Sequence, residues 1–435
     1  MPCLRAERRI RPLVSSNATL AAAAPATMPG FAERVDFVVA LAARLHAYGT
    51  TAQRLEAAVV LVSQRLGMEC QPWANPTGMI LSFNDPSLAP GEAETTRVVR
   101  VPPGENDLFR LSEADRIADE VMSGQLSLRQ GRAALAALDF PASTRRKFML
   151  TLAFGLASAS VAGLLRLPWL DIATAGCVGL LIGLLDLYKT GRPRLVEANE
   201  AVAGMVAGTL VVLVATFVGP VNLNTTIIAS LVVLLPGLAL SNAMNELTSQ
   251  HLVAGTARFA GALTTVMKLT IGTAIALGLA NLLGIEPQVH ALRPQPMWLE
   301  WAALLVGSFA FAVTFQAQRR DYLLVMAAVI SGYLISRWGT VWWGSGAGVF
   351  LGALTITAAG NAYARWGHRP GAIIRVPRII LLVPGSTSLR GLMNVIQQQD
   401  AMLGTEAVMA VINILLALLA GVLFGNLLLP TRRTL

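Results

Sequence analysis

Residues 231–246 read LVVLLPGLALSNAMNE, and residues 379–394 read IILLVPGSTSLRGLMN. In each stretch an apolar run ends at a Pro-Gly pair, Pro236-Gly237 or Pro384-Gly385, and a Met-Asn pair follows. The Pro-Gly pairs lie 148 residues apart and the Met-Asn pairs 149, so one inserted residue aligns the two copies. The chain is therefore expected to contain an internal repeat, and this repeat decides how its helices are arranged.

The composition separates a polar first third from an apolar remainder. Of the 435 residues 54% are hydrophobic and only 14% are charged, and the mean hydropathy is +0.58. Soluble domains carry about a quarter of charged residues, so an ordinary soluble enzyme is excluded. Residues 1–147 contain 17 basic and 15 acidic groups, and this near balance opposes a nucleic-acid-binding patch despite the net charge of +9.

The polar third is expected to form a small α/β domain. Residues 1–30 are interpreted as a disordered tail, with Met28 as an alternative start, and residues 31–145 as a cytoplasmic domain. Apolar residues at helical spacing predict a helix from Phe31 to Leu45, and Thr50–Gln53 is expected to cap a second one. The extended runs are predicted at Met68–Trp73, Met79–Phe83 and Arg97–Val101.

Two capping boxes predict further helices in this domain, one starting at Ser112–Asp115 and one at Ser127–Gln130. Its acidic residues Glu56, Asp107 and Asp115 are interpreted as helix caps or solvated faces. No active site is therefore expected in residues 31–145.

Apolar spans follow from Phe148 to the C-terminus. A helix needs about 20 residues to cross the hydrocarbon core of a membrane. Ten candidates satisfy this length: about 148–166, 169–188, 199–219, 221–241, 257–284, 298–318, 322–338, 340–362, 372–397 and 404–429. The first five make up residues 148–284 and the last five residues 298–430. Glycine, alanine and serine inside the spans, as at Gly204–Gly208, favour close helix packing.

The charges between the spans indicate the orientation, because basic residues gather in cytoplasmic loops. With the N-terminus inside, the outer loops and helix ends receive Arg166, Arg293 and Arg337. Fourteen basic residues fall inside: Arg145, Arg146, Lys147, Lys189, Arg192, Arg194, Arg258, Arg319, Arg320, Arg365, Arg369, Arg375, Arg432 and Arg433. Both termini are therefore expected to be cytoplasmic.

The Pro-Gly copies fall in the fourth and ninth spans, so they cross the membrane in opposite directions. Such an inverted repeat is a common plan of secondary transporters. The expected fold is a polytopic α-helical membrane protein of about ten transmembrane helices, arranged as two inverted five-helix repeats after a small α/β domain.

A Pro-Gly pair can break a membrane helix, because proline removes a backbone donor and glycine relaxes the chain. The freed polar groups must face protein or a watery cavity, and the half-helix that follows offers a positive N-terminus to a carboxylate. A simple proline kink without a ligand is the alternative.

Polar residues near the breaks supply candidate site residues, with helix caps, ion pairs and interhelical bonds as the alternative roles. Candidate solute-binding residues are Pro236, Gly237, Asn242, Asn245, Lys268, Arg378, Pro384, Gly385 and Asn394. Candidate proton carriers are Asp171, Asp186, Glu200 and Glu246, because a carboxyl in a partly dry site gains protons more readily. Lys268 lies ten residues past Arg258, about 15 Å along a helix, and is expected to need an internal partner.

Metal and cofactor chemistry is not indicated. Cys3, Cys70 and Cys177 are scattered, and the four histidines are equally dispersed. The sequence predicts no metal, no cofactor and no enzymatic activity.

Several motifs resemble the ThrE-type threonine/serine exporters in their fused two-half form. In the polar third these are Tyr48–Glu56 (YGTTAQRLE), Arg97–Val101 and Leu126–Leu128. In the apolar part they are Leu235–Gly237 with Asn242, Glu246, Gly255 and Arg258, and Leu382–Gly385. The similarity runs over about residues 31–430. Glu246 stands where relatives often have aspartate.

The resemblance implies a cytoplasmic domain, ten membrane helices and export of threonine and serine by proton antiport from a bacterial cytoplasmic (inner) membrane. The partners are then a small-molecule solute, protons and the lipid bilayer, with no nucleic acid, and a homo-oligomer is left open. Relatives split over two chains are associated with dicarboxylate export, so export of succinate-like solutes is an alternative. A membrane scaffold or enzyme whose polar domain does the work is an alternative of another class.

Overall fold

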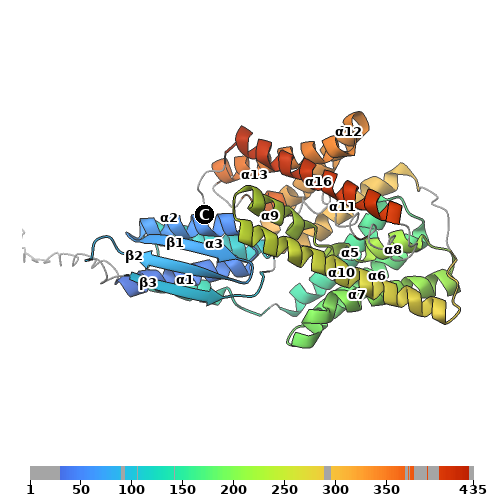
Figure 1. Ribbon diagram of the computed structural model, residues 1–435, viewed down its shortest axis with the longest axis horizontal. Helices are drawn as coiled ribbons and strands as arrows, with labels where there is room; N and C mark the ends of the chain where they lie inside the picture. Colours follow the sequence, from blue (N-terminus) through green and yellow to red (C-terminus); the bar gives the residue numbers. More distant parts are fainter. Residues whose placement is uncertain are drawn as a thin grey trace, which may run out of the picture.

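A computed structural model describes residues 30–89, 94–104, 106–141, 143–288, 295–367, 371, 373–376, 389 and 401–430 of the chain. A mixed helix-and-strand part lies at one end and a larger bundle of helices at the other (Figure 1). The second Pro-Gly motif, with the candidates Arg378, Pro384, Gly385 and Asn394, lies outside the described residues, as does the tail before residue 30.

The first part, which we call the polar domain, comprises four helices and three strands. Its elements are α1 (Phe31–Ala47), α2 (Ala52–Arg65), β1 (Glu69–Asn75), β2 (Gly78–Asn84), β3 (Glu94–Arg100), α3 (Leu108–Met122) and α4 (Leu128–Ala137). The strands form an antiparallel sheet in the order β1-β2-β3. Met79, Leu81 and Phe83 bury one face of this sheet against the helices, while Trp73 and Val98 are exposed on the other.

The capping predictions met different outcomes. The box at Ser127–Gln130 is confirmed, since both reciprocal hydrogen bonds form at the start of α4. The box at Ser112 is wrong: α3 begins at Leu108 with Asp107 as its cap, and Ser112 lies inside the helix. Thr51 does precede α2, but its side chain makes no capping hydrogen bond.

The second part consists of long apolar helices. They are α5 (Thr144–Leu164), α6 (Trp169–Tyr188), α7 (Pro193–Phe217), α8 (Leu223–Ser230), α9 (Gly237–Thr248), α10 (Leu252–Leu282), α11 (Met297–Thr314), α12 (Tyr322–Trp343), α13 (Ser345–Gly367) and α16 (Ala401–Leu428). Short 3-10 turns, η1 (Val232–Leu234) and η2 (Arg319–Asp321), precede α9 and α12.

Within the described residues eight helices are long and apolar enough to cross a membrane, or nine when the bent pair around η1 is counted as one span. The chain is thus a polytopic helical membrane protein, as its hydropathy predicts. The ninth expected span, 372–397, lies almost wholly outside the described residues. A count of ten and the inverted repeat therefore stay predictions.

The helices pack through small residues. At the crossing of α7 and α10, a Cβ placed on Gly204 would lie 2.4 Å from the carbonyl oxygen of Leu269, too close for any side chain. The backbones of these helices therefore touch, as the small residues at Gly204–Gly208 predict. Further packing joins α5 with α6 and α11, and α13 with α12 and α16.

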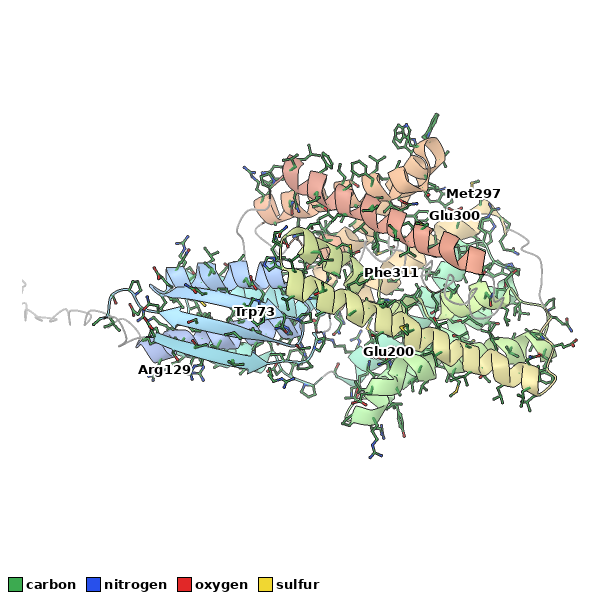
Figure 2. The ribbon with its side chains drawn as sticks, in the orientation of Figure 1. Trp73, Arg129, Glu200, Met297, Glu300 and Phe311 are labelled. Atoms are coloured by element: carbon green, nitrogen blue, oxygen red, sulfur yellow. The ribbon has the colours of Figure 1, made fainter. Side chains whose placement is uncertain are left out.

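The polar domain is bound to the helices at two places. At the first, the first turns of α2 contact the end of α9 and His251, directly before α10. At the second, the backbone N–H groups of Leu108 and Phe109 donate to the carbonyls of Phe315 and Gln316, each across 3.1 Å, at the end of α11. In Figure 2, Met297 and Glu300 at the start of α11 lie far from the polar domain, and Phe311 lies nearer to it. The loops that follow α9 and α11 therefore both face the polar domain.

Candidate functional site

The chain is broken at Pro236. Helix α8 ends at Ser230, and α9 starts at Gly237 directly after the proline. The bend of 59° lies at Leu231, between Leu223–Ser230 and Val232–Thr248. The break predicted from the first Pro-Gly pair is present. Its helix runs on to Thr248, seven residues beyond the expected end of the span, because Asn242, Asn245 and Glu246 face protein rather than lipid.

A cavity of about 90 Å³ lies where α9 meets the polar domain. Its walls come from both parts of the chain: the α1–α2 turn and the start of α3 on one side, and α9, α13 and α16 on the other. The lining residues are Tyr48, Gly49, Thr50, Thr51, Arg54, Asn106, Leu108, Leu111, Ser241, Asn242, Asn245, Ala353, Ile356, Thr357, Arg375, Val376, Leu418 and Val422. We call this space the arginine cavity. Pro236 and Gly237 are outside its lining, so the later turns of α9 face it rather than the helix N-terminus.

Two guanidinium groups give the arginine cavity its charge. Arg54 comes from α2 and Arg375 from the segment that follows α13, and they lie close enough for their charges to repel each other. No aspartate or glutamate is among the described residues that line the cavity. A space with two positive groups and no lining carboxylate favours an anionic group on its occupant.

Three hydroxyl groups in the lining add to this preference. The side-chain oxygens of Thr50, Thr51 and Ser241 are buried and have no hydrogen-bond partner within the part of the chain that is described. Because a buried hydroxyl without a partner is costly, such groups are typical of sites that a ligand or water completes.

The charge of Arg54 interacts with the carboxyl of Asp115, on α3. Burial raises the pKa of Asp115 to about 7, while the charge on Arg54 opposes this rise and Asp119 adds to it. Burial also lowers the pKa of Arg54. The interpretation of Asp115 as a solvated face or cap is therefore wrong: its side chain lies inside the domain, beside the arginine that faces the cavity.

The α1–α2 turn has the conformation that its sequence dictates. Gly49 has a φ of +86°, and a Cβ at this position would lie 2.5 Å from Oδ1 of Asn106. Only glycine tolerates both conditions at little cost. The turn therefore brings Tyr48, Thr50 and Thr51 to the cavity wall.

Hydrogen bonds hold this turn against the helices. The backbone N–H of Ala52 donates to Oε1 of Glu246 across 3.0 Å, and Glu246 also accepts two hydrogen bonds from Arg258, at 2.9 and 3.0 Å. Glu56 accepts from the backbone N–H of Ala74 and lies 3.0 Å from Nε2 of His251. Glu56 is thus an interface residue, not a solvated one.

The structure separates the solute-binding candidates that it describes. Asn242 and Asn245 line the arginine cavity. Lys268 does not: its Nζ donates to the carbonyl of Glu197 across 2.7 Å and lies 3.4 Å from Glu200. The expected internal partner of Lys268 is therefore Glu200 on α7, which Figure 2 labels.

The proton-carrier candidates all have partners. Asp171 is fully buried and accepts from the side chain of Asn222 across 2.6 Å. Asp186 pairs with Lys189, and Glu200 with Lys268. Glu246 is the one bound to the α1–α2 turn beside the cavity.

Sequence reasoning missed Arg54, Arg375, Thr50, Thr51 and Ser241 as site residues. Arg375 is counted above only as a loop charge, while Arg54 and both threonines appear only within a motif. The signal that could have found them is the polar run at 50–54, which directly follows a helix with a buried apolar face.

Comparison with known proteins places the chain in a family. Residues 36–280 match the family model ThrE, described as "Putative threonine/serine exporter", and residues 300–428 match ThrE_2, described as "Threonine/Serine exporter, ThrE". No solved structure matches.

Curated relatives are fungal. An uncharacterized protein of Schizosaccharomyces pombe is 23% identical over 82% of this chain and 48% of its own length. Pheromone-regulated membrane protein 10 of Pichia sorbitophila is 26% identical over 85% of this chain and 38% of its own, and that of Debaryomyces hansenii 25% over 81% and 36%. The chain thus spans about half or less of these relatives, and a bacterial inner membrane stays a prediction.

The two family matches follow one another along the chain, as the fused two-half form requires, and the first alone covers more than half of it. The chain belongs to the ThrE family of threonine/serine exporters.

Proposed function

We propose that this chain is a proton-coupled secondary transporter that exports threonine and serine, and that the arginine cavity binds the solute on the side of the polar domain. Family membership supports the class of solute. The observation that carries the site is that Arg54 and Arg375 face one cavity together with the unpartnered hydroxyls of Thr50, Thr51 and Ser241.

The chemistry of the cavity suits a carboxylate. A guanidinium group binds a carboxylate through two parallel hydrogen bonds, and this pairing is strong where water is excluded. The hydroxyls and the side chains of Asn242 and Asn245 supply further bonds to a small polar solute. The adjacent break at Pro236 gives α9 a place to move relative to α8.

Proton coupling is assigned to Glu246 in this proposal. Protonation would remove the negative charge that Arg258 and the Ala52 N–H bind. The α1–α2 turn would then be held less tightly, and the cavity could open toward the side of the polar domain. Each proton taken up would in this way favour the state in which the cavity is open toward the polar domain over the closed state.

Export of small dicarboxylates is a second candidate that one specific observation favours. An amino acid carries an ammonium group, which a carboxylate in the site would bind, yet no aspartate or glutamate is among the described lining residues. Arg54 and Arg375 could each bind one carboxylate of a solute that has two.

Transport into proteoliposomes tests both candidates. The full chain is reconstituted, a pH gradient is imposed, and uptake of labelled threonine, serine and succinate is measured. Arg54→Gln is expected to lower uptake of the true solute about tenfold or more, since one charged hydrogen-bond pair is lost. The control Arg97→Gln changes an exposed arginine on β3 and should transport normally.

The outcomes separate the proposals. Uptake of threonine and serine but not succinate supports the amino-acid solute, and the reverse supports the dicarboxylate. Equal rates for Arg54→Gln and Arg97→Gln would remove the arginine cavity from the pathway. Rates that do not respond to the pH gradient would remove proton coupling.

A further inference from the structure

A second hollow lies at the junction of the polar domain and the helices. It has a volume of about 660 Å³ and is formed by the start of α3, the start of α5 with the residues before it, and the connection from α11 to α12. We call it the basic groove. It shares no lining residue with the arginine cavity, and none of the site residues discussed above lines it.

The basic groove carries a strong excess of positive charge. Among the described residues that line it are four arginines and one acid, Glu113; the arginines are Arg145, Arg146, Arg319 and Arg320. Glu113 is already engaged, at 2.9 Å from Arg116. Arg146 is likewise bound, at 2.8 Å from Asp107.

The other three arginines, Arg145, Arg319 and Arg320, are exposed residues. Nε of Arg320 donates to Oε1 of Gln318, a neutral group that does not cancel its charge. The three arginines come from two separate segments of the chain that meet at this groove. A group that binds all three must therefore carry negative charge and sit between α5 and α12.

Exposed apolar residues follow these arginines closely in the chain. Three residues after Arg145, Phe148 on α5 is 68% exposed, and three residues after Arg320, Leu323 on α12 is 80% exposed. Arg145 and Arg320 therefore each lie about one turn before the exposed apolar stretch of the helix that follows, where such a helix would enter lipid. Phospholipid phosphates lie at this level, and basic side chains next to membrane helices bind anionic headgroups.

We propose that the basic groove binds the phosphate headgroup of an anionic phospholipid, whose acyl chains run along the exposed apolar residues of α5 and α12. A free phosphate ion would use the same arginines but would gain nothing from the apolar surface below them. Because the groove also contains Phe109 and Glu113 of α3, a bound lipid touches both the polar domain and the membrane helices. The lipid would thus hold the domain in place independently of the solute.

Lipid binding to the purified, detergent-solubilised full chain tests this assignment. A fluorescent short-chain phosphatidylglycerol is titrated by anisotropy, with the phosphatidylcholine analogue and inorganic phosphate as competitors. The groove variant is R145Q/R319Q/R320Q. Its matched control, R97Q/R100Q/R129Q, removes the same charge from exposed arginines on β3 and α4, and Figure 2 shows Arg129 at the end of the polar domain away from the helices.

We expect saturable binding of phosphatidylglycerol that the control retains and the groove variant loses by about tenfold or more, because each basic residue at a membrane surface contributes to anionic lipid binding. The charge-preserving variant R145K/R319K/R320K should bind within about threefold of the wild type, as expected for charge-driven recognition. A groove variant that failed to fold would differ from the wild type in gel filtration. In that case Arg145→Gln alone should show a partial loss that Arg145→Lys restores.

Three results would overturn the proposal. Equal affinity in the groove variant and the control would place the lipid elsewhere. Equal competition by phosphatidylcholine would remove the role of charge. Displacement by millimolar inorganic phosphate as effectively as by lipid would assign the groove to the free ion.

Discussion

The backbone N–H of Ala52 donates to the carboxylate of Glu246 across 3.0 Å, and this bond joins two residues that are 194 positions apart. The polar domain and the membrane helices meet at this point. Glu246 is fully buried, and the side chain of its partner Arg258 is 19% exposed.

Glu246→Gln is expected to lower the stability of the full chain by about 3 kcal/mol, because it leaves the Arg258 guanidinium without its charged partner. Thermal unfolding of the purified protein measures this loss. The double variant Glu246→Gln/Arg258→Met should recover part of it. If the single and double variants melt together with the wild type, the pair does not hold the two parts.

Pro236→Ala should slow transport about tenfold while leaving the protein in the membrane. Alanine permits a continuous helix where proline forbids one, so the interruption directly before α9 should close. Initial rates in proteoliposomes check this, with Pro193→Ala at the first position of α7 as control, where proline is tolerated without a bend. Normal rates in Pro236→Ala would show that the break is structural only.

The buried carboxyl of Asp115 should make stability depend on pH. Its pKa is about 7 in the folded chain against 3.8 for a free aspartate, so between these values the folded state holds a proton that the unfolded state has released. The free energy of unfolding therefore falls as the pH rises through this window, by at most about 1.4 kcal/mol per pH unit, and the loss is complete above pH 7.

Asp115→Asn removes this titration, so its melting temperature should change less between pH 5 and 8 than that of the wild type. Glu69→Gln, which replaces an exposed acid on β1, should keep the wild-type slope. Parallel slopes in all three proteins would mean that Asp115 is ionised throughout.

Gly49→Ala is expected to destabilise the polar domain by about 1–3 kcal/mol, since alanine is strained at a φ of +86° and its Cβ would collide with Asn106. Gly124→Ala measures the backbone strain alone, because Gly124 has a φ of +77° but an added Cβ there would meet open space. A loss in Gly49→Ala no larger than in Gly124→Ala would show that Asn106 moves aside.

Lys268→Gln should leave the transport rate unchanged and lower the free energy of unfolding by less than about 1 kcal/mol. Its partner Glu200 lies 3.4 Å away, both side chains are partly exposed, and such pairs contribute little. A strong loss of transport would return Lys268 to the solute pathway.

The fold could be predicted from the sequence where one physical effect dominates. The long apolar stretches predicted the spans, because a single segment in lipid can pair all its backbone N–H and C=O groups only as a helix. The Pro-Gly pair predicted the break before α9. The start of α3 was mispredicted, since Ser112 matches a capping box locally while the Asp107 side chain caps the helix one turn earlier. Either side chain could cap a helix, and the hydrogen bonds from the N–H groups of Leu108 and Phe109 to the carbonyls of Phe315 and Gln316 accompany the start at Leu108.

The site was harder to predict than the fold. Asn242 and Asn245 were recognised because they follow the Pro-Gly pair, and both line the arginine cavity. Arg54 could not be placed, because it faces the cavity only when α2 docks on α9, and no periodicity in the sequence encodes that contact. Glu246 shows the same limit, since its partners Ala52 and Arg258 come from different parts of the chain.

The arginine cavity has one wall from each part of the chain, and this division has a thermodynamic consequence. A solute that touches both walls bridges them, so its binding must strengthen the docking of the polar domain by the same free energy by which docking strengthens its own affinity. Cleaving the chain between α4 and α5 would convert that linkage into a measurable association, in which the solute raises the affinity of one fragment for the other.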